Sequence, residues 1–197
     1  MSSPPTAPIL LASTSLQRRA ILEQLGLPFD VVPPEYEEED DETASPLDLV
    51  RAHAAGKARS VAGQAGDRHV LGVDTAVVLD GTAYGKPDDV EAAVEMLEAL
   101  GGRTHEVVSG LCLVTPGWEE VADETTRVTF RPLTPRDIAM YISAGEWEGR
   151  AGAYAIQGRG AALVEGIEGD YLNVVGLPAA LLIRLLAERF SGAYGFG

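Results

Sequence analysis

Near the N-terminus, an apolar run leads through a hydroxyl-rich turn into a helix signal, and this unit limits the fold more than any other feature. Pro8 to Ala12 predicts a buried strand, and Ser13 to Ser15 supply capping hydroxyls. Leu16 to Leu25 have helical apolar spacing, with Gly26 in a C′ position. A helix N-terminus therefore follows directly on a strand, which requires a sheet whose face the helix can cover.

The remaining elements mix βα units with a hairpin meander. Further strands are expected at residues 29–32, 69–73, 76–79, 106–115 and 120–130. Further helices are expected at residues 46–62, 89–100, 135–144 and 178–190. This order predicts an α/β fold with a mixed, twisted sheet and flanking helices. We expect one domain over residues 7–191, with tails at residues 1–6 and 192–197.

Charge and cysteine content restrict the partners. The chain has 30 acidic and 15 basic residues and a net charge of −15, which argues against a nucleic-acid polymer as partner. Small phosphorylated ligands fit if a few cations, backbone amides and a divalent metal offset the field locally. The single cysteine, Cys112, permits no internal disulfide and favours a cytoplasmic location. We find no signal peptide, and the most apolar segment, at 177–186, is too short to span a membrane.

Two segments combine polar side chains with strand ends, and each has a plainer explanation. Ser15 and Arg18 lie at the first helix N-terminus, where hydroxyls, amides and a guanidinium suit a phosphate. Simple helix capping with exposed arginines is the alternative. Asp74 follows a strand and could hold a metal or activate water, or merely cap a turn.

Two further segments could approach a ligand. Lys86 precedes a proline, which holds it extended as a phosphate contact or as a solvated lysine. Residues 150–160 contain closely spaced glycines that let the backbone approach a ligand or form a tight structural loop. These glycines match neither a P-loop nor a dinucleotide fingerprint.

Each signal is weak alone, but their order along the chain is specific. The ordered segments are Leu-Ala-Ser-x-Ser with Arg18, Lys57-Ala, Asp74-Thr, Gly-Lys86-Pro, Gly-Arg-Thr-His105, Gly-Glu146, Ala-Gly-Ala-Tyr-Ala-Ile-Gln157-Gly and Asn173-Val-Val-Gly-Leu-Pro. Over residues 9–182, they resemble the Maf family of nucleoside triphosphate pyrophosphatases.

The resemblance implies a fold like that of the inosine triphosphate pyrophosphatases, with two lobes around a nucleotide cleft, and often a homodimer. It implies hydrolysis between the α and β phosphates that depends on a divalent metal, Mg or Mn. It assigns phosphate contacts to Ser15, Arg18, Lys57 and Lys86, and the role of central catalytic carboxylate to Asp74. It assigns the metal to Glu38 and Asp74, and a substrate-selective amide to Gln157.

The chain departs from the family pattern at two places. Leu16 and Gln17 replace the proline and first arginine of the usual Ser-Pro-Arg-Arg, and only the second arginine is kept, as Arg18. Arg150 replaces the family lysine before Ala-Gly, which keeps the charge and changes the donor geometry.

Gln157 bears on the substrate. Its amide offers both a donor and an acceptor, which matches the O4 and N3–H edge of uracil or thymine, whereas a glutamate offers only acceptors. We therefore expect dTTP and UTP as substrates. Two alternatives are a pyrophosphatase for 7-methyl-GTP or another modified nucleotide, and a nucleotide-sensing regulator of cell division with little turnover. Retention of Asp74, Lys86 and Gln157 disfavours the regulator.

Overall fold

The computed structural model describes residues 7–39, 43–190 and 194–196, which form a mixed sheet of seven strands. The strand order is β2–β1–β3–β5–β6–β7, and β4 pairs with β3 outside this path. The strands are β1 (Ile9–Ala12), β2 (Phe29–Val32), β3 (Val70–Leu79), β4 (Thr82–Tyr84), β5 (Thr104–Thr115), β6 (Trp118–Phe130) and β7 (Val164–Glu168). β1 is parallel to both β2 and β3, whereas all other pairings are antiparallel. The mixed α/β sheet expected from the sequence is confirmed.

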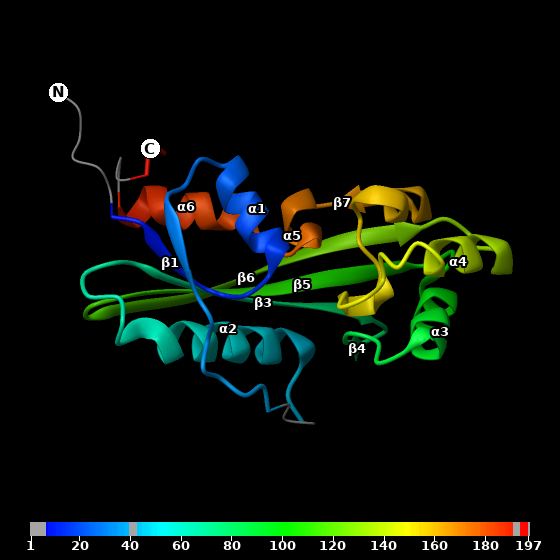
Figure 1. Cartoon of the computed structure of the whole chain (residues 1–197), viewed down its shortest axis with the longest axis horizontal. Coiled ribbons are helices and arrows are strands. Elements are labelled where there is room, and N and C mark those ends of the chain that lie inside the picture. The colour runs from blue at the N-terminus through cyan, green and yellow to red at the C-terminus, as the bar shows by residue number, and fades with distance from the viewer. Residues whose placement is uncertain (1–6, 40–42, 191–193, 197) are drawn as a thin grey trace.

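Helices cover both faces of this sheet. They are α1 (Leu16–Gln24), α2 (Pro46–Ala62), α3 (Val90–Leu100), α4 (Pro135–Ile142), α5 (Tyr171–Val175) and α6 (Ala179–Arg189), with 3-10 turns η1 (Ala151–Ala153) and η2 (Gly158–Leu163). Figure 1 shows α1, α5 and α6 on one face, α2 on the other, and α3 and α4 together at one end of the sheet. Within the described residues, no helix is long and apolar enough to cross a membrane.

The structure corrects the expected elements in four places. The strands expected at 69–73 and 76–79 are one continuous strand, β3, so Asp74 lies within a strand rather than at its end. This strand continues because β5 pairs with it without a break from Val70 to Val78, with Asp74 opposite Gly110. The glycine-rich stretch contains β7, which the sequence analysis missed because its five residues, VEGIE, include only two β-branched residues. The short helix α5 and the three-residue strand β4 were also missed.

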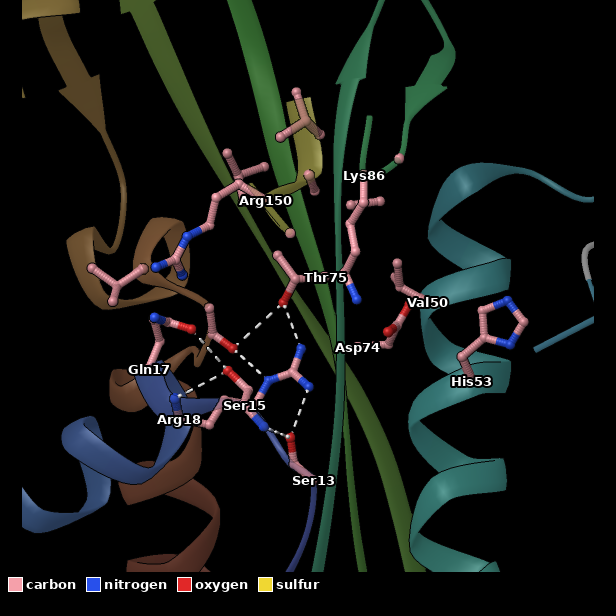
Figure 2. Close-up of a pocket in the computed structure, with 18 of the residues that line it drawn as sticks. Ser13, Ser15, Gln17, Arg18, Val50, His53, Asp74, Thr75, Lys86 and Arg150 are labelled. Carbon is pink, nitrogen blue, oxygen red and sulfur yellow. Dashed lines mark hydrogen bonds between the residues drawn. The ribbon is translucent and has the colours of Figure 1, made fainter. Parts of the chain in front are cut away.

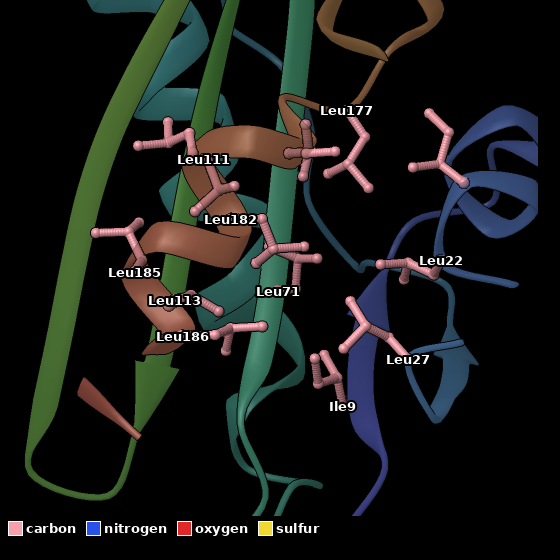
Figure 3. Close-up of a cluster of buried hydrophobic side chains, with 14 of the residues drawn as sticks. Ile9, Leu22, Leu27, Leu71, Leu111, Leu113, Leu177, Leu182, Leu185 and Leu186 are labelled. Atoms are coloured by element: carbon pink, nitrogen blue, oxygen red, sulfur yellow. The ribbon is translucent and has the colours of Figure 1, made fainter. Parts of the chain in front are cut away.

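The larger hydrophobic core lies between the sheet and the helices α1 and α6. Alternate residues of β1, β3 and β5 face the apolar stripe of α6, as Figure 3 shows for Leu71, Leu113 and Leu182. Tyr194 and Phe196, which the sequence analysis assigned to a tail, pack against this core because their rings have apolar surface to bury. The expected tail at residues 1–6, and residues 192, 193 and 197 of the other, lie outside the described residues.

Helix α2 packs on the opposite face with its backbone almost touching the sheet. Two glycines make this possible, one on β3 and one on β5. A Cβ atom at Gly72 would lie 2.1 Å from the carbonyl oxygen of Ala54, and one at Gly110 would lie 2.2 Å from that of Val50. Neither position can hold a side chain unless the helix moves away. The two glycines therefore set the height of α2 above the sheet.

We expect Gly110→Ala to destabilise the fold by about 1–3 kcal/mol, the usual cost of overpacking a tight contact. Gly166→Ala is the matched control, because Gly166 is also a strand residue but has open space around its Cβ direction. Urea unfolding of both variants measures the difference. Equal stability of the two variants would show that α2 tolerates displacement.

Candidate active site

A cavity of about 580 Å³ opens between the β1–α1 turn, helix α2, the middle of β3 and the segment 149–157. Its lining includes all seven residues that the sequence analysis selected: Ser15, Arg18, Glu38, Lys57, Asp74, Lys86 and Gln157. These residues come from six separate segments of the chain. Figure 2 shows Ser15, Arg18, Asp74 and Lys86 around this space.

Lys57 joins two carboxylates at the centre of the cavity. Its Nζ lies 2.6 Å from Asp74 Oδ1 and 2.6 Å from Glu38 Oε1. The side chains of Lys57 and Asp74 are only 10% and 15% exposed, whereas that of Glu38 is 51% exposed. Burial alone would raise the pKa of Glu38, but the hydrogen bond and positive charge of Lys57 lower it overall. The lowered pKa favours the charged form of Glu38, and Lys57 attracts both carboxylates by opposite charge.

The carboxylate pair fits a divalent cation that arrives with a phosphorylated ligand. Asp74 and Glu38 converge on one point, since a single ammonium group contacts both. Among the described residues, no group of three or more His, Cys, Asp or Glu side chains could hold a metal ion. Mg²⁺ commonly uses one or two protein carboxylates and completes its coordination with water and substrate phosphates. The pair therefore provides the protein ligands for such a cation, and water and substrate phosphates would provide the others.

Arg18 is held by acceptors from three segments of the chain. Its Nε donates to the Gly176 carbonyl oxygen at 2.9 Å, Nη1 to Ser13 Oγ at 3.3 Å, and Nη2 to Thr75 Oγ1 at 3.3 Å. Burial lowers the pKa of this guanidinium, which the charges of Asp74 and Glu38 counter. Because an arginine has five N–H donors, two remain for a ligand. Arg18 thus ties the β1–α1 turn to β3 beside Asp74.

Ser15 caps helix α1, which was the plainer of its two expected explanations. Its Oγ accepts from the Arg18 backbone N–H at 3.4 Å and donates to Gln17 Oε1 at 3.3 Å. The Ser15 backbone N–H is also bonded, to Ser13 Oγ at 3.2 Å. Capping does not remove Ser15 from the cavity wall, so its contact with phosphate stays a prediction.

Lys86 is an exposed residue on the loop after β4. Its side chain points toward Asp74 in Figure 2, and its charge helps to lower the pKa of Glu38. Lys57 and Lys86 therefore place two positive charges beside the carboxylate pair.

Another part of the cavity wall is formed by the segment 149–157. Arg150 lines the cavity, and Gln157 lies at its exposed rim. Behind this wall, the Tyr154 hydroxyl is hydrogen-bonded to His105 Nε2 at 2.8 Å. Burial lowers the pKa of His105 to about 4, so this imidazole is neutral at pH 7.

The sequence analysis missed several residues of the site. Thr75 stands beside Asp74, and its hydroxyl lies 2.8 Å from Ser109 Oγ on β5 and accepts from Arg18. His53, on α2, is hydrogen-bonded to the Tyr36 hydroxyl at 3.0 Å. The sequence did hold one signal of close packing here, a glycine within the predicted helix at position 56. The structure explains it, because a Cβ at Gly56 would lie 2.2 Å from the Tyr36 ring.

Comparisons with known proteins identify the family of the chain. The family described as Maf-like protein matches residues 8–189. A protein of Moorella thermoacetica named dTTP/UTP pyrophosphatase is 50% identical and covers 91% of this chain and 93% of its own length. A protein of Deinococcus radiodurans with the same name is 44% identical over 98% of this chain and 97% of its own.

Among solved structures, the Staphylococcus aureus Ham1 protein is 19% identical and matches with a TM-score of 0.46. The match covers 63% of this chain and 72% of that chain.

We expect His105 to make stability depend on pH below neutrality. Its folded pKa of about 4 lies below the ordinary 6.5, so the unfolded state takes up the proton first. Its contribution is complete above pH 6.5 and is lost as the pH falls toward 4, by about 2 kcal/mol between pH 7 and pH 5. Urea unfolding at both pH values measures this loss. His105→Gln should reduce it by about that amount, whereas an equal pH dependence in both proteins would contradict the assignment.

Proposed function

The chain belongs to the Maf family, and from this premise we propose that it hydrolyses dTTP and UTP to the nucleoside monophosphate and pyrophosphate. The observation that carries the proposal is the contact of Lys57 with both Asp74 and Glu38 inside a cavity of nucleotide size. Acidic groups alone would repel a triphosphate, and basic groups alone would bind it without activating water. This site holds both.

The residues fit a divalent cation, Mg²⁺ or Mn²⁺, held by Glu38 and Asp74 with the phosphate oxygens of the substrate. Bound there, the cation would neutralise phosphate charge and make the α-phosphorus more electrophilic. Binding of a cation between the carboxylates requires Lys57 to leave at least one of them. A lysine released in this way is free to contact the substrate phosphates.

We assign the proton transfer to Asp74. Its carboxylate accepts a proton from the attacking water as the water oxygen bonds to the α-phosphorus. The bond from that phosphorus to the oxygen bridging to the β-phosphate breaks, and pyrophosphate leaves with the bonding electrons. Lys57 and Lys86 offset the charge that develops on pyrophosphate, and Arg18 holds the phosphates through its two remaining N–H donors. Ser15 joins them when its hydroxyl turns from Gln17 to a phosphate oxygen.

Gln157 is assigned to the base. It is an exposed residue of the cavity lining. An amide can pair with both the O4 acceptor and the N3–H donor of a pyrimidine, which favours dTTP and UTP over purine nucleotides. The names of the Moorella thermoacetica and Deinococcus radiodurans relatives support the same substrates.

The proposal includes a cytoplasmic location and a homodimer. The only cysteine is a buried free thiol, and burial raises the pKa of Cys112 to about 12, so it is unreactive and forms no disulfide. Such a chain has no need of an oxidising compartment. The net charge of −15 supports a nucleotide rather than a nucleic-acid polymer as partner.

The first test is the identity of the products. With Mg²⁺ or Mn²⁺, dTTP should give dTMP and pyrophosphate in equal amounts, because the attack is on the α-phosphorus. Chromatography of the nucleotide and a pyrophosphate assay measure both products. Orthophosphate with dTDP would identify a γ-phosphatase instead, and preferential cleavage of 7-methyl-GTP would identify a different substrate class.

Asp74→Asn tests the role of the catalytic carboxylate, because it keeps the shape of the side chain and removes its charge. We expect kcat to fall on the order of 10²- to 10⁴-fold, the range for removing a general base or an electrostatic catalyst. Asp123→Asn, on a carboxylate that pairs with Arg51 and lies outside the cavity lining, should leave kcat unchanged. Near-normal turnover of Asp74→Asn would move the catalytic role to another carboxylate, with Glu38 tested next.

Gln157→Glu tests base selection. The change places an acceptor-only group against the pyrimidine O4, which should cost roughly 1–3 kcal/mol of specificity. We expect the ratio of kcat/KM for UTP to that for GTP to fall about tenfold. An unchanged ratio with uniformly lower rates would place Gln157 at the phosphates and leave pyrimidine preference without this explanation.

A further inference from the structure

The segment that carries Gln157 has an irregular backbone with residues in left-handed conformations. Gly152, Ala153 and Gly158 have φ values of +65°, +59° and +65°, in the left-handed region. Ala153 has a Cβ and pays a conformational cost there, which persists only where the surroundings impose it. Contacts from outside the segment must therefore fix its shape.

Two side chains beyond the segment supply these contacts. The Glu146 carboxylate accepts from the Arg159 backbone N–H at 2.9 and 3.1 Å and from the Gly160 N–H at 3.3 Å. The Tyr141 hydroxyl accepts from the Ala155 N–H at 3.0 Å. Gln157 lies between these anchored positions. Bonds to an ionised acceptor are stronger than neutral ones, so Glu146 provides the stronger anchor.

The backbone of residues 158–160 packs closely around Glu146 and against residue 155. A Cβ at Gly158 would lie 2.8 Å from the carboxylate of Glu146, and one at Gly160 would lie 1.8 Å from the carbonyl oxygen of Ala155. The backbone therefore folds tightly around the carboxylate on one side and against itself on the other. Glu146 is not among the residues that line the cavity, so it does not meet the ligand.

We propose that Glu146 is a positioning residue that fixes the direction of Gln157 and thereby sets the preference for pyrimidine over purine nucleotides. The inference rests on the proposed function, because it uses the assignment of Gln157 to the base. A residue that only stabilised the fold would lower the rates for all substrates together. A residue that aims Gln157 changes the ratio between substrates.

The experiment compares Glu146→Ala, Glu146→Gln and the control Glu148→Gln. Glu148 is an exposed carboxylate two residues away, with no side-chain hydrogen bond or ion pair in the described part of the chain. We expect Glu146→Ala to lower the UTP-to-GTP ratio of kcat/KM about tenfold. Glu146→Gln keeps one acceptor oxygen and should recover most of the ratio, and Glu148→Gln should leave it unchanged. An unchanged ratio in Glu146→Ala would overturn the proposal.

A double-mutant cycle with Gln157→Ala shows whether Glu146 acts through that side chain. If it does, adding Glu146→Ala to Gln157→Ala changes the ratio by less than about twofold, because coupled residues are not additive. A further tenfold fall in that background would show that Glu146 affects selectivity by another route, and would overturn the proposal.

Amide hydrogen exchange separates this inference from the proposed function, because it requires no turnover. In the ligand-free protein, Glu146→Ala should speed exchange at the amides of Arg159 and Gly160 by at least about tenfold. Unchanged exchange would overturn the anchoring role even in an active enzyme. A wild-type protein that cleaves no nucleotide, yet shows this change in exchange, would refute the proposed function and retain the anchor.

Discussion

The close packing of α2 on β3 and β5 is the contact on which the rest of the site depends. Gly72 and Gly110 let the helix backbone approach the sheet to a distance that no side chain would permit. At this height, Lys57 reaches Asp74 in the middle of β3 with a hydrogen bond of 2.6 Å. Larger residues at these two positions would push α2 away from the sheet, and Lys57 would then lose its contact with Asp74. A nearly buried carboxylate without a partner is costly.

This packing also explains how an acidic chain can hold an anionic ligand. The net charge of −15 opposes a triphosphate, so the attraction must be local and short in range. In the proposed function Lys57 and Lys86 supply it beside the carboxylates, and the nearly buried position of Lys57 limits screening by water. The same lysine stabilises two carboxylates in the free protein, so the site avoids self-repulsion before the ligand arrives.

Much of this could be predicted from the sequence, because the relevant signals are local. Ser45 and Pro46 mark the start of α2, and periodicity places most strands correctly. The ordered motifs also identify side chains that share one cavity. The contacts between distant segments could not be predicted. The sequence did not indicate that β3 continues through Asp74 or that Lys57 bridges Asp74 to Glu38. Nor did it indicate that three N–H groups of Arg18 donate to protein oxygens. Such contacts depend on packing, which no local pattern encodes.

Two parts of the cavity wall are held in place by different interactions, and this difference suits the two tasks proposed for them. Asp74 and Lys57 stand on a paired strand and a long helix, where backbone hydrogen bonds and tight packing fix their positions. Gln157 stands on an irregular segment whose shape depends on side chains outside it. A rigid wall suits chemistry that every nucleotide shares, since each presents the same phosphates. A wall set by a few replaceable anchors allows the choice of base to change while the catalytic wall stays the same.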